Sequence, residues 1–230
     1  MNESLQTQYR FAGAGLAADR QRVLRNTYWL LALSLVPTVL GAWIGVATGL
    51  FATLSPGIST LVFFVGAFGL MFVVEKTKDS AMGVAALLAF TFFMGLMLSR
   101  MVGYVLGFKN GTSLVMTAFG GTAAVFFAMA SLATVIKRDL SSMGKFLLVG
   151  AVILMVAGIA NIFLQSSALM LTLLVMSLAI FSAFMLYDIK RVIDGGETNY
   201  ISATLCIYLD IYNVFQSLLA LLGIFGGDRD

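Results

Sequence analysis

Histidine is absent from this 230-residue chain, and cysteine occurs once, at Cys206. The lack of histidine removes the commonest general base and the commonest neutral metal ligand. A single cysteine excludes an intrachain disulfide and any metal site built on several thiolates. Charged residues make up only 11% of the chain, about half of what a soluble domain carries. These shortages argue against most enzyme classes and against a soluble globular protein.

Hydrophobic residues make up 60% of the chain, and they gather in long runs. A run of about 20 apolar residues can cross the hydrocarbon layer of a bilayer as a helix. Seven such runs are present, at residues 27–49, 57–74, 81–106, 113–136, 144–163, 169–192 and 201–225. The sequence therefore predicts an all-α membrane protein, a bundle of seven transmembrane helices in one domain over residues 27–230. Small residues in the fourth run, such as Gly120 and Gly121, favour close helix packing.

A polar segment, residues 1–26, precedes the first apolar run. This segment is too long for the charged start of a signal peptide, so we expect the first run to be an uncleaved span. Pro37 within that run can kink the helix. We interpret residues 1–26 as a cytosolic tail, and two readings stay open: a disordered flank of the membrane anchor, or a handle for a cytosolic partner.

The basic residues indicate the orientation of the bundle. With seven spans and the N-terminus inside, 11 of the 14 Lys and Arg residues fall on the cytoplasmic side. An excess of Lys and Arg marks cytoplasmic segments. We therefore expect a cytoplasmic N-terminus and a periplasmic C-terminus. The net charge of +3 is explained by this bias and does not indicate nucleic-acid binding.

Two carboxylates stand near the joint between the last two runs. Asp188 lies close to the end of the sixth run, and Asp210 lies about nine residues into the seventh. Antiparallel neighbours would bring both side chains together roughly 8–14 Å below the cytoplasmic surface. Two carboxylates in a dry site cannot both ionise cheaply, so the pair should titrate as a unit. Such a pair can share one proton or bind a hard cation such as Ca²⁺.

Several readings of these charges remain open. Lys76 or Lys78, at the end of the second run, could reach one carboxylate, and protonation that broke such a pair could open a cytoplasmic gate. Asp188 could instead be an interfacial charge that faces water, and Asp210 could lie on a solvated face. Arg100 fits either an outer-interface anchor that snorkels or a pore-lining residue.

Ordered motifs in the second half of the chain carry a family resemblance. They are IKRDLSSMG after the fourth run, ANIFLQ at the end of the fifth, LYD in the sixth and YLDIYNVFQSLLALLG in the seventh. With these motifs the chain resembles the Bax inhibitor-1 (TMBIM) family of seven-span proteins, from about residue 22 onward. The stretches RVLRNTYWLL, FGLMF, GGTAAVFF and GGETNYI resemble its proteobacterial YccA-type branch.

The resemblance implies two functions. The YccA-type branch implies a bacterial inner-membrane protein that binds and modulates the membrane-anchored AAA+ protease FtsH through its cytosolic tail, where Arg10, Arg20 and Arg22 are the candidates here. Other family members are pH-sensitive Ca²⁺ leak channels, and Asp188 and Asp210 match their paired aspartates. Neither implied function requires a cofactor or enzymatic activity. An intramembrane aspartyl mechanism stays only a formal alternative, because no nucleophile–base pair accompanies the carboxylates.

Overall fold

The computed structural model describes residues 3–51 and 53–227, and within these ranges every regular element is an α-helix. Each helix has a segment long and apolar enough to cross a membrane. The predicted fold class, a bundle of seven transmembrane helices, is confirmed. The helices are α1 (Glu3–Thr48), α2 (Pro56–Thr77), α3 (Ala81–Leu106), α4 (Gly111–Val135), α5 (Met143–Leu164), α6 (Ser167–Ile193) and α7 (Tyr200–Gly226).

Three of the helices begin at a polar side chain that caps free backbone amides. The hydroxyls of Ser55 and Ser166 each accept a hydrogen bond from an amide in the first turn of α2 and α6. The Asn199 side chain accepts two such bonds at the start of α7, at 2.9 and 3.1 Å. Ser and Asn are preferred caps because their side-chain oxygens satisfy donors that the helix itself leaves unpaired. These caps fix the residue at which each of the three helices begins.

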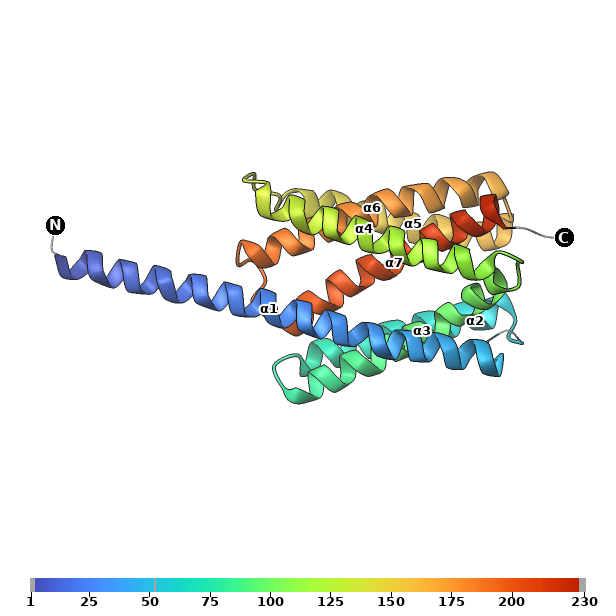
Figure 1. Cartoon of the computed structure of the whole chain (residues 1–230), viewed down its shortest axis with the longest axis horizontal. Helices are drawn as coiled ribbons and strands as arrows, with labels where there is room; N and C mark the ends of the chain where they lie inside the picture. The colour runs from blue at the N-terminus through green and yellow to red at the C-terminus, as the bar shows by residue number, and fades with distance from the viewer. Residues whose placement is uncertain (1–2, 52, 228–230) are drawn as a thin grey trace.

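The first helix begins 24 residues earlier than the apolar run predicts, because α1 continues without interruption from Glu3 through Pro37 to Thr48. The segment expected as a separate tail is thus the first half of one long helix, and the reading as a disordered flank is not what the structure shows. Most of these residues are good helix formers, and each glycine at 13 and 15 costs only about 1 kcal/mol relative to alanine. In Figure 1, α1 projects well beyond the rest of the bundle at its N-terminal end.

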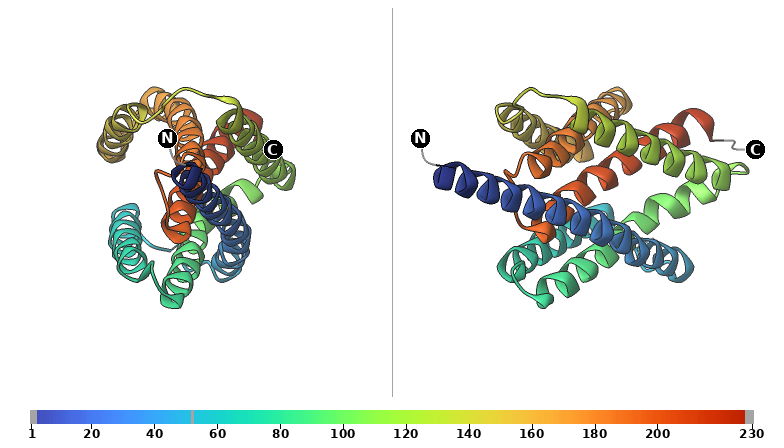
Figure 2. Two further views of the ribbon diagram at one scale, coloured as in Figure 1. Left: turned by 90° about the vertical axis from the view of Figure 1, so that its left-hand side faces the viewer. Right: turned by 60° about the vertical axis from the view of Figure 1, so that its left-hand side comes forward.

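Two groups of three helices flank α7. Helices α1 and α2 both pack on α3, while α4 and α5 both pack on α6. The end-on view of Figure 2 shows α7 between these groups, and α7 contacts every other helix except α5. Among the described residues, α5 contacts α6 alone and buries none of its own residues. Its outward residues, including Phe146 at 78% exposure, therefore face the lipid.

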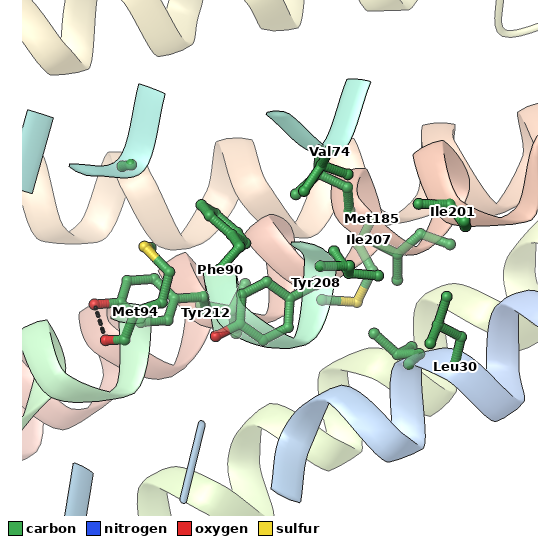
Figure 3. Close-up of a cluster of buried hydrophobic side chains, with 14 of the residues drawn as sticks. Leu30, Val74, Phe90, Met94, Met185, Ile201, Ile207, Tyr208 and Tyr212 are labelled. Carbon is green, nitrogen blue, oxygen red and sulfur yellow. Dashed lines mark hydrogen bonds between the residues drawn. The ribbon is translucent and has the colours of Figure 1, made fainter. Parts of the chain in front are cut away.

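Aromatic residues of α7 belong to a cluster of buried hydrophobic side chains, as Figure 3 shows. The Tyr208 ring meets Phe90 of α3 edge-on at 6.0 Å, and its hydroxyl lies 2.9 Å from the Thr38 hydroxyl of α1. The Tyr212 hydroxyl donates to the carbonyl oxygen of Met94 at 3.3 Å. Buried tyrosines usually find such partners, because an unpaired hydroxyl is costly inside a protein. These contacts hold α7 against α1 and α3.

Glycines permit a close backbone approach between α1 and α3. A Cβ atom on Gly41 would lie 2.2 Å from the carbonyl oxygen of Phe92, and one on Gly95 would lie 2.1 Å from that of Thr38. Neither oxygen can move without moving a helix. In contrast, a Cβ on Gly120 would meet nothing within 4 Å. Of the small residues of α4 that the sequence singled out, Gly121 packs on α7, where a Cβ would lie 3.3 Å from Leu218, whereas Gly120 makes no close contact.

Candidate functional site

The structure brings Asp188 of α6 and Asp210 of α7 together, as the sequence predicted. The two carboxyl groups lie close enough to act electrostatically on each other. A hydrogen bond between them would require a proton on one of them, since ionised carboxylates only accept. Asp210 is only 4% exposed, and its Oδ2 atom has no hydrogen-bond partner among the described residues. A proton shared with Asp188 would give that oxygen a partner. The pair is therefore suited to hold one proton and one negative charge.

The lysines expected as counter-charges lie elsewhere. Lys78 forms an ion pair with Glu75, three residues before it on the same segment, and that hydrogen bond raises the pKa of the lysine. The Lys76 ammonium lies 5.5 Å from the centre of the Phe72 ring. The expected contact of either lysine with the acid pair is therefore wrong, because each finds a nearer partner on α2. The cation close to Asp188 is Arg191, one turn further along α6.

The turn between α6 and α7 is cross-linked at the end of the bundle that holds the N-terminus. The Lys190 ammonium pairs with Asp194 at 2.6 Å, and the Arg191 guanidinium pairs with Glu197 at 3.1 Å. The Asn199 amide donates to the Asp79 carboxylate at 2.8 Å and to the Lys78 carbonyl oxygen at 3.1 Å. The α6–α7 turn is thereby fixed to the α2–α3 turn. These bonds lie between the acid pair and that end of the molecule.

The α4–α5 connection belongs to the same charged surface. The Ser141 amide and hydroxyl donate to the Asp139 carboxylate at 2.8 and 2.9 Å. These two bonds, helped by the positive charge of Lys190, hold the pKa of Asp139 below its usual range. Lys190 therefore acts electrostatically on acidic residues from two turns, Asp139 and Asp194, and the α4–α5 turn lies close to the α6–α7 turn.

A line of polar residues extends from the acid pair along α7. Cys206, Asp210, Asn213 and Ser217 are spaced four, three and four residues apart, so they share one face of the helix. The Ser217 hydroxyl donates to the Ser177 hydroxyl of α6 at 3.0 Å. The α6–α7 interface is thus polar at two levels, one at the acid pair and one nearer the C-terminal end of α7. The helical spacing could have revealed this line, but the sequence interpretation considered only the charged member.

Sequence comparison assigns the chain to a family. A family profile described as "Inhibitor of apoptosis-promoting Bax1" matches residues 20–227, nearly the whole chain. The protein belongs to the Bax inhibitor-1 family. The acid pair, the α6–α7 turn and the polar line of α7 all lie within the matched residues, so this Bax inhibitor-1 protein carries its candidate site in the part that the family shares.

Several bacterial relatives match over most of their length. "Modulator of FtsH protease YccA" of Escherichia coli K12 is 38% identical over 207 residues, which cover 90% of this chain and 92% of the relative. "Uncharacterized protein PA2604" of Pseudomonas aeruginosa is 37% identical over 226 residues, covering 97% of this chain and 100% of the relative. An "Uncharacterized membrane protein" of Vibrio cholerae is 38% identical over 207 residues, covering 90% of this chain and 91% of the relative. The resemblance to the YccA-type branch is confirmed.

The acid pair of this Bax inhibitor-1 protein does not resemble a resident Ca²⁺ site. Among the described residues, no group of three or more Cys, Asp or Glu side chains is placed to hold a metal ion. Ca²⁺ takes about six to eight oxygen ligands, and two carboxylates supply at most about four. A permanently bound Ca²⁺ at Asp188 and Asp210 is therefore not supported by the donors present.

The other residues that the sequence singled out lie at opposite ends of the bundle. Arg20 and Arg22 are exposed on α1, and a Cβ on Gly195 (φ +81°) would lie 2.5 Å from the Arg20 guanidinium. The base of the projecting helix thus contacts the α6–α7 turn. The Arg10 side chain is outside the described part of the chain. Arg100 donates to the Ser59 hydroxyl of α2 at 3.3 Å and is exposed, which agrees with an anchor near the outer interface.

Proposed function

We propose that this protein binds a membrane-anchored AAA+ protease of the FtsH type and modulates its activity. The relative in E. coli K12 carries the name of such a modulator and matches most of this chain. The structural observation that carries the proposal is the projecting N-terminal half of α1 (Figure 1). Residues 3–17 precede the apolar part of the helix, and as a helix they reach roughly 22 Å from it.

The projecting half of α1 suits a protease that works from the cytoplasmic face. Isolated helices of about 15 residues are marginally stable in water, so a protease that pulls on this segment would meet little resistance there. The seven-helix bundle behind it is resistant by comparison, because unfolding it requires extraction from the bilayer. A protein built this way can occupy the protease without being degraded quickly, and the result is reduced turnover of other membrane substrates.

The test compares the full chain with a variant that lacks residues 2–17. Both proteins are reconstituted with the protease and a membrane substrate, and the rate of substrate degradation is measured. We expect the full chain to slow degradation and the shortened chain to have no effect. Asp210→Asn serves as a matched control that leaves the projecting segment intact and should slow degradation as the full chain does. Equal inhibition by the shortened chain would refute the proposed role of the segment.

A second function is favoured by the contact between Asp188 and Asp210. We propose that this pair gates a cation leak that responds to pH. We expect the pair to hold together while it shares one proton, because a carboxylic acid then donates to a carboxylate. Loss of that proton leaves two negative charges in contact, and a second proton removes the charge-assisted bond. Each change weakens the α6–α7 contact at the acid pair, where the N-terminal end of the bundle is otherwise closed by the cross-linked turns.

The leak is tested by Ca²⁺ flux into proteoliposomes from about pH 5 to about pH 8. We expect flux that changes with pH in the parent protein and pH-independent flux in Asp188→Asn and Asp210→Asn. Asp139→Asn is the control, because it removes a carboxylate of the exposed α4–α5 turn and should keep the parent profile. The absence of flux at every pH would exclude a leak and leave the protease-binding proposal standing.

A further inference from the structure

A groove runs beside α1 near the end of the bundle that holds the N-terminus. Its volume is about 630 Å³, and its lining residues recur at intervals of one to three along a single face of α1: Ala18, Gln21, Arg22, Leu24, Arg25 and Tyr28. The Tyr28 ring packs edge-on against Phe126 of α4, with the ring centres 6.1 Å apart. The backbones of α1 and α4 are not in contact along their described residues. The two rings therefore bridge the space between these helices at the place where Tyr28 lines the groove.

The groove carries two positive charges that no acidic side chain in the described part of the protein neutralises. Arg22 and Arg25 are both exposed, and neither forms an ion pair with a described side chain. Asp19, one turn before Arg22, does not pair with it either. The situation differs at the α6–α7 turn, where Lys190 and Arg191 both have carboxylate partners. Two free guanidinium groups on one rim create a binding site for an anion.

The groove lies where the charged part of α1 meets its apolar part. Arg25 is the last charged residue of the helix, and no charge follows before Thr48. Trp29, one turn beyond Arg25, is 73% exposed. Tryptophan gathers at the headgroup level of membranes, and arginine near helix ends extends toward the same level. The cationic rim is therefore at the depth of the lipid phosphates, and Tyr28, about one turn beyond Arg25, lies on the side nearer the acyl chains.

We propose that this groove binds an anionic phospholipid. The Arg22 and Arg25 guanidinium groups hold the phosphate, with Gln21 as a further donor, and one acyl chain packs against Leu24 and Tyr28. An acidic segment of a partner protein would satisfy the two arginines equally well. These apolar side chains and the membrane depth favour a lipid, because a polar segment would leave its backbone unpaired against them.

The two tryptophans of the chain, Trp29 and Trp43, make the site measurable by fluorescence. Trp43→Phe leaves Trp29 as the only reporter, next to the groove. This parent variant is placed in two kinds of phosphatidylcholine nanodisc. One contains a small fraction of phosphatidylglycerol with brominated chains, and the other contains the same fraction of phosphatidylcholine with brominated chains. We expect stronger quenching of Trp29 by the brominated phosphatidylglycerol. Arg22→Gln with Arg25→Gln should remove this preference, because each basic residue near an anionic surface contributes about fivefold in affinity.

Lys76→Gln with Lys145→Gln is the matched control. It removes the same charge from exposed positions at the same end of the bundle, away from the groove, and should keep the preference. If the arginine variant has the same melting temperature as the parent variant, its loss of the preference is a loss of lipid binding and not a loss of folding. Equal quenching by the two lipids, or an equal loss in the control variant, would overturn the proposal. Loss of the stronger quenching by phosphatidylglycerol when soluble glycerol phosphate is added would also overturn the proposal, since the groove would then bind a free phosphate group.

Discussion

At the scale of single residues, Asn199 connects two turns and a helix. Its side chain accepts from the Ile201 and Ser202 amides and donates to the α2–α3 turn. Asn199→Ala removes all of these bonds. We expect a loss of roughly 2 kcal/mol in stability, from a lost helix cap and lost bonds between the turns. Thermal unfolding of the purified protein in detergent measures this loss.

Asn199→Asp separates the two roles of this residue. An aspartate keeps the acceptor that caps α7, but it places a second carboxylate against Asp79. We expect Asn199→Asp alone to be destabilised, and Asn199→Asp combined with Asp79→Asn to recover most of the loss, because the exchange restores a donor and an acceptor. A double variant no more stable than the single one would show that the bond to Asp79 does not hold the turns together.

The acid pair could be predicted from sequence, whereas its charged neighbours could not. Asp188 and Asp210 stand in apolar runs, where a carboxylate is costly and needs a partner. Lys76 and Lys78 were expected to supply a counter-charge to the acid pair. Instead, Lys78 pairs with Glu75 and Lys76 lies over the Phe72 ring, each within about one turn. The direction in which a side chain points from its helix decides which partner it contacts. That direction depends on packing, which cannot be read from a single sequence.

At the scale of helices, the contact of α1 with α3 depends on the absence of a side chain at Gly95. A Cβ at this position would lie 2.1 Å from a backbone oxygen of α1. We expect Gly95→Ala to destabilise the protein by about 1–3 kcal/mol, because the two helices must separate to admit the methyl group. Gly120→Ala in α4 is the control, and with no atom within 4 Å of the added Cβ it should be neutral or slightly stabilising. Similar melting temperatures for the two variants would contradict the close contact.

The helices themselves were predictable to different degrees. The ends of α3, α5 and α6 fall close to the predicted limits, because an apolar run of membrane length leaves little choice of boundary. The start of α1 was missed by 24 residues. The residues before the apolar run are polar or small, so hydrophobicity carries no signal there. Their helical propensity is a weak prior, and it becomes decisive only because a stable helix already begins at the membrane and can be extended.

At the scale of the whole molecule, one end of the bundle collects the features on which function depends. The projecting half of α1, the α6–α7 turn, the α2–α3 turn and the lipid groove are all at this end (Figure 1). Most Lys and Arg residues are also there, which predicts that this end faces the cytoplasm. The protease proposal requires that orientation, because a segment on the periplasmic side could not meet a cytoplasmic protease.

Cysteine labelling in whole cells tests the orientation. Cys206→Ser removes the single native thiol, and Thr53→Cys or Ser141→Cys then introduces a thiol at an exposed position in the α1–α2 or the α4–α5 connection. A maleimide that does not cross the inner membrane should label Thr53→Cys in intact cells and Ser141→Cys only after permeabilisation. The reverse pattern would place the N-terminus outside. It would exclude capture of α1 by a cytoplasmic protease while leaving the acid pair and the fold unchanged, so this measurement can remove one of the two proposed functions before either is assayed.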